Sequence, residues 1–167
     1  MRQLGTSWWS ARLRRTWKYL HAGVGASDRA ELANWLNPGE LALFDGQPAG
    51  DKRHGLDVVA SLRAAGATDR DLLVAGVLHD CGKGPSIRLP HRVAWSLGQH
   101  YGAWIWRVCN HLPTFRTGLA GLRDHATRSA ELAARAGCGA RTVELIRNQE
   151  TPTDDAGRLL LAADEAN

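Results

Sequence analysis

The sequence lacks any hydrophobic run long enough to cross a bilayer. No window approaches the roughly 18 uninterrupted apolar residues that a transmembrane helix needs, so we expect no membrane span. The N-terminus also lacks the apolar core of a signal peptide, because arginines interrupt it at positions 12, 14 and 15. We therefore expect no secretory signal.

The sequence has few cysteines, and they are not arranged in pairs. Cys81, Cys109 and Cys138 are widely spaced and form no Cys-x-x-Cys motif. This pattern is neither a disulfide framework nor a zinc knuckle. Unpaired thiols are typical of a reducing compartment, so the sequence predicts a cytoplasmic protein.

Acidic residues are missing from the first 20 positions, which carry five basic residues: Arg2, Arg12, Arg14, Arg15 and Lys18. The whole chain has 21 Lys and Arg against 17 Asp and Glu, so the remainder is slightly acidic. The pI of about 9.3 thus describes an N-terminal arm and not a basic domain. We expect no nucleic-acid binding by the domain.

The sequence also lacks the alternating pattern of strands. Val, Ile and Thr are nowhere clustered with a period of two, whereas Ala, Leu, Arg and Glu dominate, which predicts an all-α fold: a single compact helical bundle. The expected helices span 8–22, 27 or 28 to 36, 38–44, 50–65, 68–78, 88–100, 102–110, 118–136, 140–149 and 154–166.

Capping residues support several of these limits. Asn37 and Pro38 have the residue types of an N-cap and a first helical position, and Gly66 is a typical residue just after a helix end. Thr68 and Asp71 have the spacing of a capping box. Residues 1–48 are expected to form a helical extension that packs on a domain of residues 49–167.

The chemistry centres on His79 and Asp80, which end the apolar run that begins at Leu72. Burying an imidazole and a carboxylate without partners is costly, and a metal ion would satisfy both. Imidazole and carboxylate are usual ligands of Mn, Fe, Co, Ni and Zn. His54 on the preceding helix and Asp164 in the apolar end of the last helix are the candidates to complete the ligand set.

This order of residues resembles the HD-domain superfamily of metal-dependent phosphohydrolases, whose pattern is H…HD…D. The matching runs are Arg53-His54, Ala75-Gly-Val-Leu-His79-Asp80-Cys-Gly-Lys83 and Leu160-Leu-Ala-Ala-Asp164. The segment from His125 to Gly137 is also similar to a helix of the family. The resemblance covers about residues 50–167 and implies an HD-type helical domain there.

Binuclear members of the superfamily place additional histidines between the HD pair and the last Asp. Here Asn148 and Gln149 stand on the penultimate helix where a histidine is common. We therefore expect one tightly bound metal, and neither a di-iron oxygenase nor a cyclic-dinucleotide phosphodiesterase. His125 is left as a candidate for substrate binding or for a second ion.

The resemblance implies hydrolysis of a nucleotide or another small phosphate ester by a metal-activated water. Asp80 is then both ligand and catalytic residue, and Lys83 is expected to bind the phosphate and stabilise its charge. Four protein ligands leave open positions on octahedral Mn, Fe, Co or Ni but none on tetrahedral Zn. The alternative is a non-catalytic HD-fold sensor or scaffold that binds a nucleotide or a partner protein.

Overall fold

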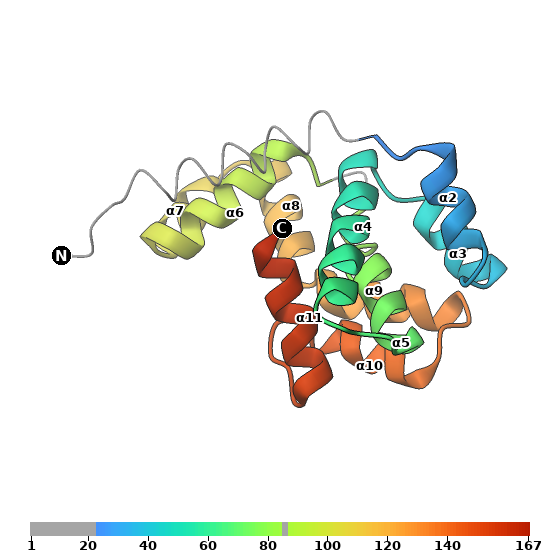
Figure 1. The fold of residues 1–167 in the computed structure, drawn as a ribbon. Coiled ribbons are helices and arrows are strands. Elements are labelled where there is room, and N and C mark those ends of the chain that lie inside the picture. Colours follow the sequence, from blue (N-terminus) through green and yellow to red (C-terminus); the bar gives the residue numbers. More distant parts are fainter. Residues whose placement is uncertain (1–22, 85–86) are drawn as a thin grey trace.

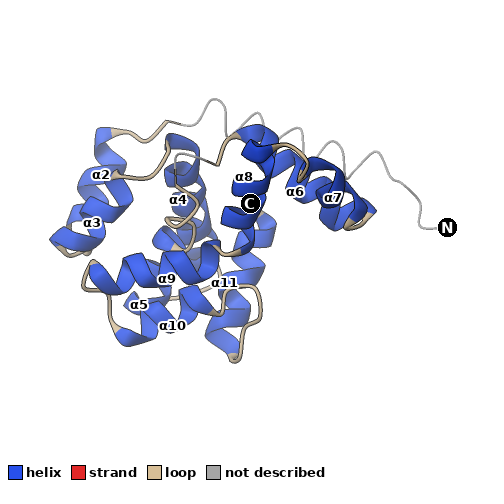
Figure 2. Cartoon of the chain, turned by 180° about the vertical axis from the view of Figure 1, so that it is seen from behind, coloured by secondary structure: helices blue, strands red, loops and turns tan. Residues whose placement is uncertain are grey.

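The structure, a computed structural model, describes residues 23–84 and 87–167. The helix expected at 8–22 lies outside the described residues, which form helices and no strand (Figure 2), as predicted. In order, the helices are α2 (Ala26–Ala33), α3 (Pro38–Asp45), α4 (Ala49–Ala64), α5 (Arg70–Leu78), α6 (Leu89–Tyr101), α7 (Trp104–Cys109), α8 (Pro113–Arg123), α9 (His125–Arg135), α10 (Ala140–Arg147) and α11 (Asp155–Ala166).

Helix α5 is the centre of the bundle. Every residue from Leu72 to Leu78 is buried, so the helix is apolar around its whole circumference. It packs against α3, α4, α10 and α11, which lie around it in Figure 1. The end of α5, where His79 and Asp80 follow, is therefore fixed by contacts on several sides.

The N-terminal helices α2 and α3 share this core. Leu32, Leu36 and Phe44 are buried in the same cluster as Val58 of α4 and Val74 of α5. The described part of the expected extension thus packs on the rest of the chain.

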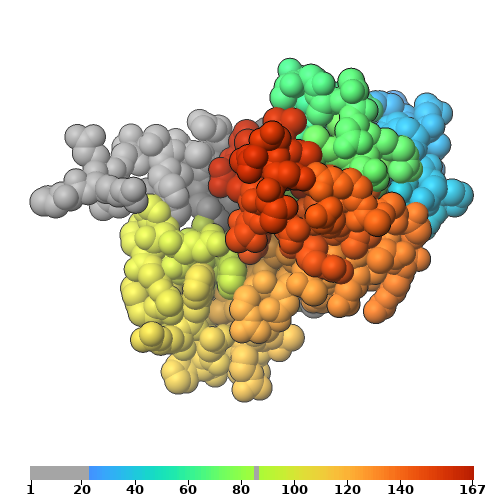
Figure 3. Space-filling view, turned by 90° about the horizontal axis from the view of Figure 1, so that it is seen from below, coloured from blue at the N-terminus to red at the C-terminus, as the bar shows by residue number. Residues whose placement is uncertain are grey.

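Helices α6, α7 and α8 extend to one side of this bundle (Figure 1). From below they form a region apart from α2–α5, with α11 between the two (Figure 3). Helix α6 packs on both α7 and α8, and α8 also contacts α9. None of the described helices is long and apolar enough to cross a membrane.

Two predicted helix starts need correction. Helix α2 is capped by Gly25 and not by Ser27 or Asp28, because Asp28 lies inside the helix and its Oδ2 accepts the Gly25 N–H at 3.0 Å. Helix α5 is capped by Asp69 and not by Thr68, because the Asp69 carboxylate reaches the backbone N–H of Asp71 at 3.1 Å. The predictions at Asn37 and Gly66 are confirmed.

The single helix expected over 118–136 is wrong. The chain forms α8 and α9 there, and Asp124, with φ −100° and ψ 7°, ends the first and precedes the second. His125 is consequently the first residue of a helix, and this break determines where its side chain lies.

Candidate metal centre

The first two site residues directly follow α5. His79 is the C-cap of that helix, and its backbone carbonyl accepts a hydrogen bond from the Gln149 side chain at 3.0 Å. His79 and Asp80 are 1% and 3% exposed. Since burial of unpaired ionisable groups is costly, the neighbouring groups must compensate both side chains.

His54 approaches from α4, which packs closely on α5 at this level. A Cβ on the next residue, Gly55, would lie 2.7 Å from the backbone oxygen of Val77, so only glycine fits there without a shift. The close packing brings the His54 and His79 rings to a centroid distance of 5.2 Å, in an edge-to-face arrangement.

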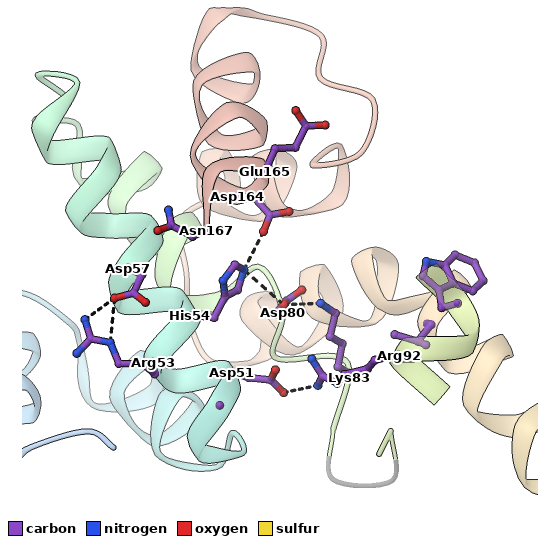
Figure 4. A pocket seen from close by; sticks show the side chains of 13 residues that line it. Asp51, Arg53, His54, Asp57, Asp80, Lys83, Arg92, Asp164, Glu165 and Asn167 are labelled. Carbon is purple, nitrogen blue, oxygen red and sulfur yellow. Dashed lines mark hydrogen bonds and ion pairs between the residues drawn. The ribbon is translucent and has the colours of Figure 1, made fainter. Parts of the chain in front are cut away.

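Asp164 approaches from α11. Leu160 and Ala163 bury this helix against the core, and Asp164 follows Ala163 directly. Its Oδ1 lies 2.7 Å from His54 Nε2, although the two residues are 110 positions apart in the chain (Figure 4).

Three of the four predicted ligands converge on one point. Ligand atoms of His54, His79 and Asp164 all lie within 4.8 Å of one another, an arrangement that could hold a metal ion. The Nε2 of His79 lies 3.5 Å from Asp164 Oδ1. This Nε2 is buried and has no hydrogen-bond partner among the described residues, so it is an orphaned polar atom that a metal would satisfy.

Asp80, the fourth predicted ligand, lies at the edge of this cluster. Its Oδ1 is 3.6 Å from His79 Nε2, and its Oδ2 is 4.0 Å from His54 Nε2. The same Oδ2 pairs with the Lys83 ammonium group, which faces the site (Figure 4). Asp80 thus connects the imidazoles to the lysine.

His125 completes the ring of residues around Asp80. Its Nε2 lies 3.5 Å from Asp80 Oδ1, and its Nδ1 lies 3.9 Å from the Glu150 carboxylate. The hydroxyl of Ser129, one turn further along α9, accepts the Gly82 backbone N–H at 2.8 Å and fixes the loop after Asp80 to this helix.

Backbone carbonyls orient two of the imidazoles. Nδ1 of His79 lies 3.0 Å from the Gly76 oxygen, and Nδ1 of His125 lies 2.6 Å from the Leu122 oxygen. Each Nδ1 donates its proton to a carbonyl, so each Nε2 faces the site, where it can bind either a proton or a metal ion. This arrangement is typical of metal-binding histidines.

Two carboxylates, those of Asp80 and Asp164, lie beside the His79 ring. Burial alone would lower the pKa of His79, but Asp80 and then Asp164 raise it to about 9. Burial likewise opposes ionisation of Asp80, yet Lys83 and His79 hold its pKa well below the usual range. Without a metal, His79 therefore carries a second proton at pH 7, and the carboxylates that favour this proton would also favour a metal cation in its place.

His125 behaves differently from His79. Burial lowers its pKa more than the charge of Asp80 raises it, so His125 is neutral at pH 7. A neutral Nε2 can bind a cation or accept a proton.

The cluster opens into a cavity of about 330 Å³. Asp80, Lys83, His54 and Asp164 line it together with residues that the sequence did not identify as a group: Gly50, Asp51, Arg53, Asp57, Arg92, Trp95, Leu122, Glu165 and Asn167. Two ion pairs lie in its wall, Arg92 with the buried Asp51 at 2.7 Å and Arg53 with Asp57 at 2.5 Å (Figure 4).

Sequence reasoning did not find the roles of Asp51, Glu150 and Gln149. Gln149 is buried and supports His79 by a hydrogen bond, which gives a structural reason for an amide at that position. The only sequence signal for Asp51 was its position three residues before His54 on the same helix. His91 accepts the Arg88 backbone N–H at 3.1 Å and packs on Phe115.

Comparison with protein-family models, with curated proteins and with solved structures found no match for this chain.

Proposed function

We propose that the chain is a metal-dependent phosphohydrolase of the HD-domain superfamily that acts on a nucleotide or another small phosphate ester. The observation that carries the proposal is the convergence of His54, His79 and Asp164 from three helices, with Asp80 and Lys83 beside them. The H…HD…D order in the sequence supports the same conclusion. The unpaired thiols support a cytoplasmic location.

The candidate ligands are His54, His79, Asp80 and Asp164. A divalent ion held by them would supply a bound water of lowered pKa and a Lewis acid for a phosphoryl oxygen. Mn, Fe, Co or Ni fits better than Zn, because octahedral ions keep open positions with four protein ligands.

The remaining chemistry belongs to the chain's own residues. Asp80 is ionised, so it can orient an attacking water or accept its proton. Lys83 contacts Asp80 and lines the cavity, where its ammonium group can stabilise the negative charge that develops on a transferred phosphoryl group. His125 is placed to accept or donate a proton from the other side of Asp80.

The test compares two alanine variants of the full chain with added Mn²⁺. Asp80→Ala should lose both metal retention and hydrolysis of p-nitrophenyl phosphate, by at least about a hundredfold, because it removes an anionic ligand. His100→Ala is the control, since His100 is exposed on α6 and does not line the cavity. Equal activity of the two variants would contradict the proposal.

Lys83→Ala separates catalysis from metal binding. We expect it to lower turnover while the metal content stays that of the wild type. A chain that retains metal but hydrolyses no phosphomonoester or phosphodiester would instead support the alternative, a non-catalytic sensor or scaffold.

A further inference from the structure

One wall of the cavity is aromatic. Trp95 on α6 is half-buried and lines the cavity that also contains His54, Asp80 and Lys83. Its indole stacks on that of Trp106 from α7, with a centroid distance of 4.7 Å and an interplanar angle of 19°. Trp106 therefore covers one face of Trp95, and a ligand ring can stack only on the other.

Contacts with Trp106 fix the position of Trp95. The Trp106 indole N–H donates to the Trp95 backbone oxygen at 3.1 Å. Gly98, one turn after Trp95, makes room for this contact, because a Cβ there would lie 1.9 Å from Trp106 Nε1. The two indoles thus form a unit in which Trp95 has little freedom to turn out of the cavity wall.

A buried ion pair connects this aromatic wall to the metal-binding helix. Arg92 lies three residues before Trp95, on the same side of α6, and also lines the cavity. Its guanidinium binds Asp51 of α4, which is 1% exposed and precedes His54 by three residues. The distance between the Trp95 indole and the candidate metal ligands is therefore set by the fold.

From this geometry we infer that Trp95 determines substrate specificity and that the substrate carries a planar aromatic group. The phosphate end lies toward Lys83 and the candidate metal ligands, and the aromatic group stacks on the face of Trp95 that Trp106 does not cover. A cavity of about 330 Å³ fits one small ester of this kind and not a polymer. Only the position of the phosphate end in this inference rests on the proposed function.

The test uses two phosphonates that the enzyme cannot hydrolyse, phenylphosphonate and cyclohexylphosphonate, titrated calorimetrically into the full chain with Mn²⁺. Both rings are apolar and of similar size, and stacking on an indole favours the planar one. We expect phenylphosphonate to bind about tenfold more tightly, a ratio within the range of ring stacking on aromatic side chains.

Three variants test whether Trp95 causes the tighter binding of phenylphosphonate. Trp95→Leu should bring the ratio of the two affinities close to one, and Trp95→Phe should keep most of it. Trp104→Leu is the control, because Trp104 is exposed on α7 and does not line the cavity. A wild-type ratio near one, an unchanged ratio in Trp95→Leu, or no binding of either phosphonate would overturn the inference.

Further measurements identify the aromatic group and distinguish the role of Trp95 from the proposed hydrolase function. If the natural group is a nucleobase, adenosine or cytidine should compete with phenylphosphonate; if neither competes, the group is a simpler aryl ring. Preserved aromatic preference without hydrolysis of any ester would reject the proposed function alone. Hydrolysis with equal affinity for both phosphonates would reject the role of Trp95 alone.

Discussion

The helices that carry the candidate metal ligands bury their apolar side chains, whereas α6–α8 expose many of theirs. The main core draws on α2–α5 and α9–α11 and includes no described residue between 79 and 129. Among the described residues, the large exposed apolar side chains all lie in the other region: Val93, Tyr101, Trp104, Val108 and Leu112. The cavity lies between the two regions, and both contribute to its wall.

The two regions therefore hold different parts of the candidate site. The candidate ligands at 54, 79, 80 and 164 are held by the main core, so their geometry depends on dense packing. Trp95 and Arg92 belong to the less buried region and are fixed by a few specific contacts, the Trp106 stack and the Asp51 ion pair. We therefore expect substitutions to affect metal binding and substrate recognition independently.

A matched pair of leucines tests the contrast in stability. Leu62 is fully buried in the main core, and Leu112, just before α8, is 56% exposed. Leu62→Ala should lower the free energy of unfolding by about 2–5 kcal/mol, because it leaves a cavity. Leu112→Ala should change it by about 0.5 kcal/mol or less. Equal effects in urea denaturation would show that the two regions do not differ in this way.

Substitutions at two glycines test whether metal binding and substrate recognition depend on separate regions. In Gly55→Ala the new methyl group meets the Val77 backbone, so α4 and α5 must move apart and carry His54 away from His79. We expect Mn²⁺ affinity to fall about 10–100-fold, as for other disturbances around metal ligands.

In Gly98→Ala the new methyl group meets the Trp106 side chain instead. This variant should keep the wild-type Mn²⁺ affinity and lose the preference for phenylphosphonate. Calorimetry measures both quantities in each variant. A loss of metal in Gly98→Ala comparable with that in Gly55→Ala would mean that the regions act as one unit.

The smallest effect concerns the start of α11, the helix that carries Asp164. The Gly157 backbone N–H and then the Arg141 side chain lower the pKa of Asp154, which caps this helix. A carboxyl with a lowered folded-state pKa stabilises the fold above its unfolded pKa of about 4, and this contribution is lost as the pH falls through the folded value.

Asp154→Ala should therefore lower Tm slightly at pH 7, and the difference from the wild type should shrink below about pH 4. Thermal unfolding with a chelator present measures this without interference from bound metal. Glu131→Ala is the control, since Glu131 is exposed within α9 and caps no helix. If the Tm difference between Asp154→Ala and the wild type stays constant down to pH 3, the charge of Asp154 does not stabilise the fold.

The sequence predicted the helical class from local signals, and it predicted the convergence of His54, His79 and Asp164 from their apolar contexts together with the resemblance to the H…HD…D order. An apolar run that ends in His79-Asp80 implies a buried helix end, and an Asp in an apolar helix implies a partner. The position of His125 beside Asp80 depends on the break at Asp124, where a continuous helix was expected. No local signal marks that break.

Two other contacts within the fold could not be predicted from the sequence. The pairing of Asp51 with Arg92 joins positions 41 residues apart, and the stack of Trp95 on Trp106 depends on the turn between α6 and α7. Each of these residues has an ordinary explanation on its own, a solvated charge or a core aromatic. Only the fold brings Asp51, Arg92 and Trp95 to one cavity.

Metal stoichiometry tests the central claim most directly. The full chain, loaded with Mn²⁺ and dialysed at neutral pH, should retain close to one ion per chain by elemental analysis. His79→Ala, which removes the orphaned Nε2, should retain almost none. A wild-type content no higher than that of His79→Ala would contradict the metal centre. A content near two would contradict the single site and assign His125 and Asp80 to a second ion.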